Sequence, residues 1–368
     1  MRTAIALLVF NCFLMTGCSS DLEPVEGCVG NGPVEPICQF RKPEDLELLP
    51  DGKTLVVSQM GDIDGHEPGS LVLYDTADGI IQRLPLFTED TDKNWGGQSC
   101  PGAPGAQFSP HGIHLSRNAV GENRLLVVNH GGRESVEFFE VIRDGGHWRL
   151  DWRGCVVAPP GSLLNDVVAL PGAGFLVTHM FPKSNPRWGN IGTEIIKASL
   201  GIDTGSVLHW DGLNFREMKG SKAPVPNGIQ INESGDEVYL NVYMGSEVRK
   251  LSFPDGELLG SAEIKSPDNI QWAGERLLVA SHVASVGDML ACSKVNSETS
   301  ACAAAFEIVE LNPDTMQLTR LFAHSGAPMG AATVAQRVGD ALYLGSYVGN
   351  RIARVTLPPD QSAPGLRQ

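Results

Sequence analysis

Short apolar runs alternate along the chain with turn residues, a pattern typical of β-strands rather than of long helices. One unit recurs: a polar or small pair, an apolar residue, a strand-like stretch, a turn, and further strand-like stretches. Turn signals such as Pro50-Asp51-Gly52 and Pro254-Asp255-Gly256 separate these stretches. The unit begins six times, at Glu44-Asp45-Leu46, His111-Gly112-Ile113, Asn165-Asp166-Val167, Asn227-Gly228-Ile229, Asp268-Asn269-Ile270 and Gly330-Ala331-Ala332.

Two more strands are predicted in every unit. The second strands are expected at 54–58, 124–129, 174–178, 237–241, 276–281 and 341–345, and the third at 70–74, 135–141, 206–210, 247–253, 305–311 and 351–356. Six units of three to four short strands predict an all-β fold, a six-bladed β-propeller, over residues 38–357, with a C-terminal tail at 358–368. Two β-sandwiches are the alternative, but they offer no reason for a repeat in phase.

The first strand of each blade lines the central channel of a propeller, so the polar residues that begin the units should converge there. They are Glu44, Asp45, His111, Asn165, Asp166, Asn227, Asp268 and Asn269. Carboxylate and carboxamide oxygens without a thiol favour calcium over zinc or copper, and four carboxylates in one place would repel without a cation. Alternatively, these residues only cap strand entries and turns.

The N-terminus is typical of an exported protein. The apolar run at 4–13 follows Arg2 and is too short for a transmembrane helix, and residues 14–18, LMTGC, resemble a lipobox. We therefore expect a signal peptide at 1–17, lipidation of Cys18 and a flexible tether at 18–37. Ser19 favours the outer membrane, with the domain facing either the periplasm or the exterior. An ordinary signal peptide with a chance cysteine is the alternative.

Export makes disulfides the expected state of the remaining cysteines. Of the eight, Cys12 would leave with the signal peptide and Cys18 would be lipidated. Six are left: Cys28, Cys38, Cys100, Cys155, Cys292 and Cys302. Six cysteines allow about 15 pairings, among which sequence alone cannot choose. Proximity favours Cys28 with Cys38 and Cys292 with Cys302, which leaves Cys100 with Cys155.

Composition excludes several function classes. The formal net charge is −15, and the scattered Lys and Arg residues are outnumbered, which argues against a nucleic-acid partner. With 42% hydrophobic and 19% charged residues, the chain can form a large core. No GxGxxG or GxxxxGK[ST] motif supports a nucleotide cofactor, and no GxSxG motif supports a serine nucleophile.

The units carry motifs that closely resemble the serum paraoxonase/arylesterase family, whose propellers are related to those of gluconolactonase and strictosidine synthase. The matching stretches are Glu44-Asp45-Leu46-Glu47, Phe108-Ser109-Pro110-His111-Gly112-Ile113, Leu126-Val127-Val128-Asn129-His130, Leu164-Asn165-Asp166-Val167, Pro226-Asn227-Gly228-Ile229 and Asp268-Asn269-Ile270. They follow the family's order with similar spacing, and the resemblance spans residues 38–357.

The resemblance implies a propeller with two calcium ions in its central tunnel. The catalytic calcium would be held by Glu44, Asn165, Asn227, Asp268 and Asn269. A deeper, structural calcium would use Asp45, Asp166 and the backbone carbonyl of Ile113. His111 and His130 match the family's proposed histidine dyad, and His179 matches a further histidine of the substrate pocket.

These residues suggest a hydrolytic mechanism for a lactone or aryl ester. Calcium would polarise the substrate carbonyl, while His111 takes a proton from the attacking water and His130 orients it and relays the proton. His111 could instead be a buried structural imidazole, with Glu44 or Asp268 as the base. The sequence therefore predicts a calcium-dependent lactonase or arylesterase.

Two alternatives remain at this point. A gluconolactonase-like sugar lactonase shares the propeller but typically uses one metal. A non-catalytic, calcium-stabilised binding module predicts a closed tunnel, or His111 and His130 without solvent contact. A strictosidine-synthase-like condensing enzyme is disfavoured, because such a site need not hold a metal.

The chain also departs from the family. The family closes its ring with a disulfide to a C-terminal cysteine, but no cysteine follows Cys302 here, so closure should rely on strand pairing between the termini. A lipobox replaces the family's N-terminal helix. Residues 181–204 lie where the family has a lid helix, and 195–200 are expected to be amphipathic. The composition of this segment differs, so substrate preference does not transfer.

Overall fold

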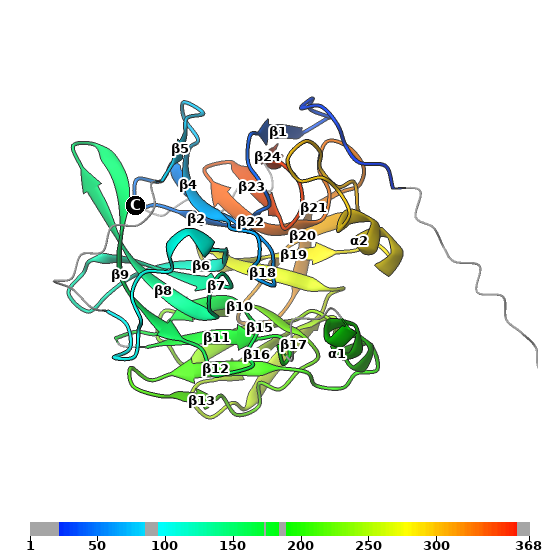
Figure 1. Cartoon of the computed structure of the whole chain (residues 1–368). Helices are drawn as coiled ribbons and strands as arrows, with labels where there is room; N and C mark the ends of the chain where they lie inside the picture. The colour runs from blue at the N-terminus through cyan, green and yellow to red at the C-terminus, as the bar shows by residue number, and fades with distance from the viewer. Residues whose placement is uncertain (1–21, 85–94, 173, 184–188, 359–368) are drawn as a thin grey trace, which may run out of the picture.

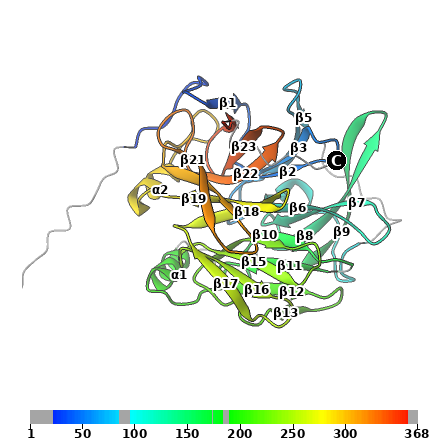
Figure 2. The same cartoon turned by 180° about the vertical axis from the view of Figure 1, so that it is seen from behind.

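Six four-stranded antiparallel sheets form a β-propeller in the computed structural model, which describes residues 22–84, 95–172, 174–183 and 189–358. Figures 1 and 2 show the sheets from opposite sides, with the first and last blades side by side. The innermost strands are β2 (Pro43–Leu48), β6 (Pro110–Arg117), β10 (Leu164–Ala169), β14 (Pro226–Ile231), β18 (Pro267–Ala273) and β22 (Ala332–Val338). Neighbouring innermost strands contact one another in a closed ring, which confirms the expected architecture.

The other strands follow in order toward the rim of each blade. The second strands are β3 (Thr54–Gln59), β7 (Asn123–Asn129), β11 (Phe175–His179), β15 (Glu237–Val242), β19 (Arg276–His282) and β23 (Ala341–Ser346). The third are β4 (Ser70–Asp75), β8 (Ser135–Asp144), β12 (Ser206–Trp210), β16 (Glu247–Ser252), β20 (Phe306–Leu311) and β24 (Arg351–Thr356). The outermost are β5 (Ile81–Arg83), β9 (His147–Val157), β13 (Phe215–Glu217), β17 (Leu258–Glu263), β21 (Leu318–His324) and β1 (Val34–Cys38). The expected second and third strands are confirmed and differ only at their ends.

The last blade is closed by the N-terminal strand. β1 pairs antiparallel with β24, from Val34 opposite Val355 to Cys38 opposite Arg351. The expected closure by strand pairing is therefore confirmed. The propeller begins at Val34 rather than at residue 38, because the outer edge of β24 needs a partner for its backbone groups.

The segment before β1 also differs from the expected flexible tether. Val25 pairs with Ala301, and the guanidinium Nη1 of the buried Arg351 donates a hydrogen bond to the Gly27 carbonyl at 2.6 Å. Residues 22–33 therefore include contacts to the propeller. The expected signal peptide at 1–17, the expected lipidation site Cys18, residues 19–21 and most of the expected tail at 358–368 lie outside the described residues.

The core lies between the blades. Leu125 and Val127 on β7 pack with the first blade, whereas Leu126 and Val128 pack against the third blade and its Phe175. Successive residues of a strand point to opposite faces, so a strand covered on both sides must be apolar throughout. This explains why the second strands are continuous apolar runs in the sequence.

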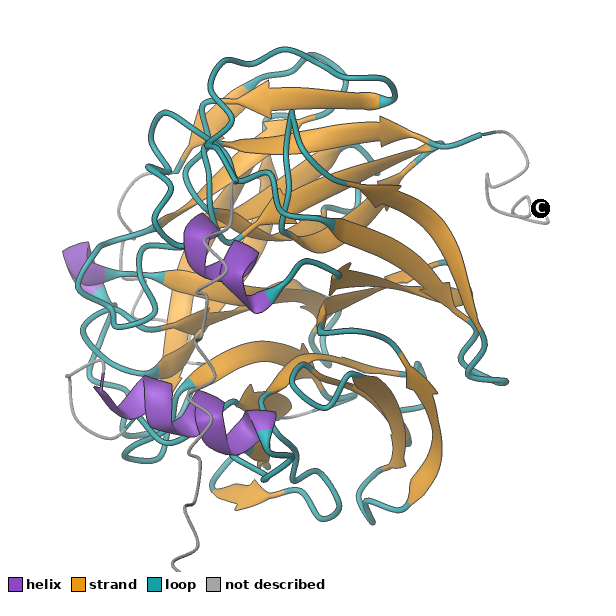
Figure 3. Ribbon diagram, turned by 90° about the vertical axis from the view of Figure 1, so that its right-hand side faces the viewer, coloured by secondary structure: helices purple, strands orange, loops and turns teal. Residues whose placement is uncertain are grey.

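Two helices lie on the same side of the sheets (Figure 3). α1 (Gly189–Ser199) falls in the segment where a lid helix was expected, and it buries Ala198 while exposing Ile195 and Ile196. α2 (Val286–Cys292) begins with a capping box between Ser285 and Asp288. Among the described residues, no helix combines the length and apolar character needed to span a membrane.

Three disulfides join the pairs that proximity favoured: Cys28 with Cys38, Cys100 with Cys155, and Cys292 with Cys302. The pair Cys100–Cys155 fixes the loop before β6 to the long strand β9. All six cysteines among the described residues therefore form disulfides.

Candidate active site

The innermost strands share an irregularity where the polar residues lie. The regular pairing between the first and second strand is interrupted in all six blades, between Pro43 and Asp45 in the first and between Leu164 and Val167 in the third. A regular strand would turn adjacent side chains to opposite faces, whereas a bulge can aim both toward one space. Because of the bulges, the side chains of adjacent residues such as Asn165 and Asp166 can both point toward the propeller axis.

Glycines allow these bulges to approach one another. A Cβ on Gly112 would lie 2.6 Å from the Asn165 carbonyl oxygen, and one on Gly228 would lie 2.4 Å from the Asp268 carbonyl oxygen. Any side chain would push the neighbouring strand away. This explains the glycine in the motifs His111-Gly112-Ile113 and Asn227-Gly228-Ile229.

An outer ring of the tunnel consists of Glu44, Asn165, Asn227, Asp268 and Asn269, all of them buried. The amide nitrogen of each asparagine has a partner: Asn165 donates to the Met180 sulfur at 3.4 Å, Asn269 to Glu44 Oε1 at 2.9 Å, and Asn227 to Asp268. The Asn241 amide also donates to the Asp268 carbonyl. The structure thus joins these residues in two pairs, Asn269 with Glu44 and Asn227 with Asp268. Asn165 lies on β10, which contacts β14, the strand of Asn227.

The same ring leaves four side-chain oxygens without a hydrogen bond. They are Glu44 Oε2 and the Oδ1 atoms of Asn165, Asn227 and Asn269. A buried polar atom without a partner costs about 1–3 kcal/mol, so four together form a set of donors that a bound cation would satisfy. Carboxylate and amide oxygens are suited to calcium.

An inner layer consists of Asp45 and Asp166, whose oxygens are occupied. Asp45 accepts the N–H groups of Leu46 at 2.8 Å and of Ile113 at 2.7 Å. Asp166 accepts those of Val167 at 2.8 Å and of Ile229 at 2.8 Å. Each carboxylate therefore links its own strand to the next blade. Ile113, expected to contribute a carbonyl, contacts Asp45 through its N–H.

Burial and crowding disfavour the charged form of these acids. Burial, followed by the neighbouring carboxylates Glu44 and Asp166, raises the pKa of Asp45 well above its ordinary value. The pKa of Asp166 and that of Asp268 are raised as well, in both cases mainly by burial and further by Glu44. A bound cation would reverse this effect by favouring the carboxylates.

The described residues contain no group of three or more His, Cys, Asp or Glu side chains arranged to hold a metal ion by themselves. Amide oxygens supply most of the unpartnered atoms in the outer ring. This composition excludes a zinc-type His/Cys cluster there but remains compatible with a hard cation, for which carboxamides are good ligands.

Two histidines lie beside the outer ring. His111 Nδ1 is 2.7 Å from His130 Nε2, and His111 Nε2 is 3.6 Å from Glu44 Oε1. The His111 side chain keeps 7% of its surface exposed, whereas that of His130 is fully buried. Burial lowers the pKa of His130, although Glu134 opposes the shift. The expected pair is thus in hydrogen-bonding contact, with His111 nearer the ring.

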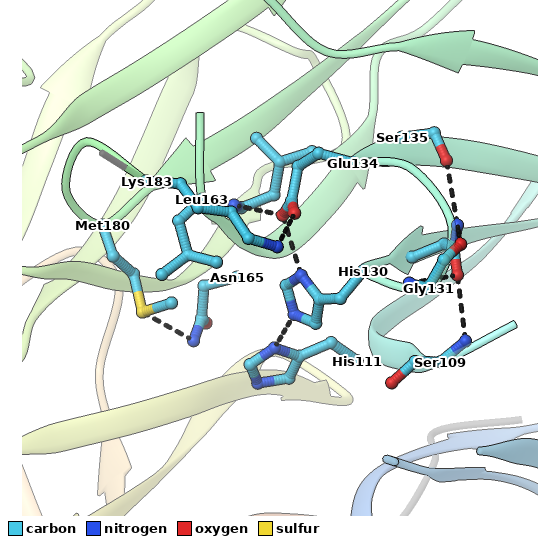
Figure 4. Close-up of polar contacts among 12 residues, drawn as sticks. Ser109, His111, His130, Gly131, Glu134, Ser135, Leu163, Asn165, Met180 and Lys183 are labelled. Carbon is cyan, nitrogen blue, oxygen red and sulfur yellow. Dashed lines mark hydrogen bonds and ion pairs between the residues drawn. The ribbon is translucent and has the colours of Figure 1, made fainter. Parts of the chain in front are cut away.

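Figure 4 shows a partner of His130 that the sequence did not indicate. His130 Nδ1 is 2.8 Å from Glu134 Oε1, and Lys183 Nζ is 3.2 Å from Glu134 Oε2. Glu134 and Lys183 escaped notice because they lie between strands and outside the repeated unit starts.

A second histidine contact was also missed. His282 Nδ1 lies 2.9 Å from the Tyr243 hydroxyl and 3.6 Å from Asp268 Oδ2, and burial lowers the pKa of His282 to about 4. His130, Tyr243 and His282 all stand at the end of a second strand. A search of that position in every unit could have found them.

His179 ends β11 but makes a different contact. Its Nδ1 accepts the Leu163 N–H at 3.1 Å, and burial lowers its pKa. The contacts described for His179 tie it to the backbone near Leu163, and none joins it to the outer ring. The structure therefore places His179 on the same blade as Asn165 but does not bring it into the cluster.

Comparison with known proteins agrees with this fold. The chain resembles the structure of a gluconolactonase from Xanthomonas campestris, with 16% identity, a TM-score of 0.50, and coverage of 92% of this chain and 96% of that one. It also resembles a luciferin-regenerating enzyme, with 15% identity, a TM-score of 0.52, and coverage of 91% and 95%. At such identities the likeness shows the fold alone.

No curated protein sequence matches the chain. A family model described as Arylesterase matches residues 41–352, which include every innermost strand and all the residues of the outer ring and the inner layer. The chain therefore belongs to the Arylesterase family.

Proposed function

We propose that this protein is a calcium-dependent hydrolase of lactones or aryl esters. Membership of the Arylesterase family supports a hydrolase that acts on such bonds. The observation that carries the proposal is the ring of four unpartnered, buried oxygens directly beside the His111–His130 pair. It combines a candidate cation site with a nearby base, the two elements of a metal-assisted hydrolysis.

The outer ring would hold the catalytic calcium through Glu44, Asn165, Asn227, Asp268 and Asn269. Bound calcium supplies Lewis-acid stabilisation of negative charge on the substrate carbonyl oxygen. Asp45 and Asp166 would serve a second, structural calcium in the inner layer, since carboxylate oxygens that accept N–H bonds retain further lone pairs.

His111 is the proposed base. Of the two histidines, only His111 has an exposed part of its side chain. Its Nε2 faces Glu44. It takes a proton from water at Nε2, while its Nδ1 contact with His130 distributes the resulting positive charge. The alcohol or phenol that leaves then receives a proton from the same pair. The 7% of the His111 side chain that stays exposed supports this role over that of a purely structural imidazole.

Hydrolysis of phenyl acetate and of a medium-chain lactone by the full-length protein tests the proposal, together with gluconolactone. Activity should disappear after exhaustive chelation with EDTA and return on addition of calcium. Activity that survives chelation would overturn the metal dependence. Hydrolysis confined to gluconolactone would favour a sugar lactonase, and no hydrolysis with or without calcium would favour a binding module.

We also propose that Cys18 is lipidated and anchors the domain to the outer membrane. The lipobox-like residues 14–18 and the polar residues after them support this location. A Cys18→Ser variant should move from the membrane to the soluble fraction of the cell. Continued sedimentation of that variant with membranes would contradict the lipid anchor.

A further inference from the structure

Glu134 lies at the end of a chain of three side chains that begins in the tunnel. His111, His130 and Glu134 are joined by contacts of 2.7 and 2.8 Å between the atoms His111 Nδ1, His130 Nε2, His130 Nδ1 and Glu134 Oε1 (Figure 4). The first two were expected to work as a pair. The carboxylate adds an acceptor that fixes where the protons of both rings lie.

The proton positions follow from hydrogen-bond chemistry. An ionised carboxylate only accepts, so His130 must carry its proton on Nδ1. A neutral His130 then offers Nε2 as an acceptor, so His111 must donate from Nδ1. The free lone pair of a neutral His111 is consequently on Nε2, the atom that faces Glu44. Without Glu134, the contact between His111 Nε2 and Glu44 Oε1 would favour the reverse arrangement, with the His111 proton on Nε2.

The surroundings hold Glu134 in its ionised form and in place. The Leu164 N–H donates to Glu134 Oε1 at 2.8 Å, and Lys183 Nζ is 3.2 Å from Oε2. His130, Lys183 and the Leu164 N–H together lower the pKa of Glu134 despite its burial. The Leu164 bond also links this carboxylate to the start of β10, one residue before Asn165.

The outer end of the chain meets solvent. A surface pocket is lined by Glu134 and Lys183 together with Asp64, Arg133, Gly161 and Ser162. The side chains of Glu134 and Lys183 are 11% and 31% exposed, whereas that of His130 is fully buried. Arg133 is bonded to Glu137, so Lys183 is the cation that pairs with Glu134 there.

We infer that Glu134 is a positioning residue for the proposed hydrolysis: it sets the tautomers of His130 and His111 so that His111 Nε2 is the base. The inference rests on the proposed function for its catalytic meaning. Glu134 acts through His130, so its loss should lower kcat and leave KM almost unchanged. When His111 accepts a proton at Nε2, its Nδ1 proton can pass to His130 Nε2, and the cationic His130 is then stabilised by Glu134.

Glu134→Ala should lower kcat by about 100-fold, the lower end of what general acid–base catalysis contributes. Glu134→Gln is the milder variant, because its Oε1 can still accept from both His130 and Leu164 while the charge is lost. It should keep the tautomers and lower kcat by about 10-fold, less than the full contribution of general acid–base catalysis. Glu140→Ala is the matched control, since it breaks a carboxylate–cation pair with Arg153 in the same blade and should leave kcat unchanged.

Long-range ¹H–¹⁵N NMR of the imidazoles gives a readout that needs neither substrate nor calcium. His111→Gln and His130→Gln variants assign the signals. The wild-type protein and Glu134→Gln should show both neutral rings protonated at Nδ1, and Glu134→Ala should shift the His130 proton to Nε2.

The two experiments separate this inference from the proposed function. A His130 proton at Nε2 in the wild-type protein would overturn the positioning role, whether or not the protein hydrolyses esters. So would a Glu134→Ala variant with unchanged kcat or a loss confined to KM. Absence of all hydrolysis in a wild-type protein with the expected tautomers would overturn the proposed function and, with it, the catalytic role of Glu134.

Discussion

The two layers of the tunnel use similar side chains in opposite ways. In the inner layer, Asp45 and Asp166 each accept two backbone N–H groups and so tie neighbouring blades together. In the outer ring, the asparagine nitrogens are bonded and their oxygens are left without partners. The comparison teaches that a polar residue at the axis stabilises the fold when its acceptors are used by the backbone, and prepares a site when they are left free.

Removal of an outer-ring ligand should have the largest effect of the substitutions considered. It should lower catalytic activity. Asn165→Ala and Asp268→Asn should lower kcat/KM by about 1,000-fold, because stabilisation by a metal is worth several kcal/mol in the transition state. Thermal unfolding of the calcium-free protein should change little for Asn165→Ala, since its Oδ1 accepts no hydrogen bond and its Nδ2 donates to a thioether sulfur, a weak acceptor, at 3.4 Å. Ester hydrolysis and calorimetry measure the two effects.

Asn232→Ala is the control for this prediction. Its Oδ1 accepts the N–H groups of Gly235, Asp236 and Glu237 in a turn between β14 and β15, so this variant should lose stability and keep activity. If Asn165→Ala behaved in the same way as Asn232→Ala, the distinction between site and scaffold would fail.

A substitution in the inner layer should mainly lower the stability of the fold. Asp166→Asn replaces one of two acceptors with an NH₂ group that faces a backbone N–H, so it should lower the free energy of unfolding by about 1.5–3 kcal/mol. Denaturant titration of the calcium-loaded protein measures this loss. Unchanged stability would mean that the N–H bonds to Ile229 and Val167 do not hold the blades.

Chelated protein should become less stable as the pH rises. Asp45, Asp166 and Asp268 have folded-state pKa values above their ordinary range, so the folded state binds more protons than the unfolded state over that window, and stability falls with rising pH. Between about pH 7.5 and 8.5, histidines such as His282 are largely neutral in both the folded and the unfolded state, so they contribute little to this slope.

Melting temperatures of the chelated and the calcium-loaded protein at these two pH values provide the measurement. The slope should be strong after chelation and weak with calcium bound, because the cation favours the ionised carboxylates. Equal slopes for the two forms would indicate that calcium does not interact with these acids.

Thr333→Val should have the smallest effect. Thr333 lies in the blade whose unit start, at residues 330–332, has no acidic or amide side chain, and its hydroxyl donates to the Glu44 carbonyl at 2.6 Å. Loss of this bond should cost about 1 kcal/mol of stability. The Glu44 side chain should keep its position, so hydrolysis should change less than two-fold, which a joint measurement of unfolding and kcat/KM can resolve.

Much of the fold and of the tunnel could be predicted from the sequence. The in-phase repeat identified the six blades, because strands covered on both faces must be apolar and turns need Gly, Pro, Asn or Asp. The same repeat located Glu44, Asp45, Asn165 and Asp166 at the axis. The roles proposed for these residues still await the experiments above.

Other features lie outside the repeat and could not be predicted in this way. Glu134 and Lys183 come from loops far apart in the sequence. The segment before Val34 contacts Arg351 of the last blade and Ala301, which lies between α2 and β20. Such contacts depend on loop paths, which follow no local periodicity.

By itself, the sequence determined the propeller, its closure by the termini, and the polar residues that gather at the axis. Only the tertiary structure decided which of their atoms are engaged and which are free. Asn165 and Asp166 are adjacent and chemically similar, yet a bulge directs one to an open ring and the other to the N–H groups of Val167 and Ile229. Hydrogen-bond partners come from neighbouring blades, so their direction is fixed only when the blades have packed together.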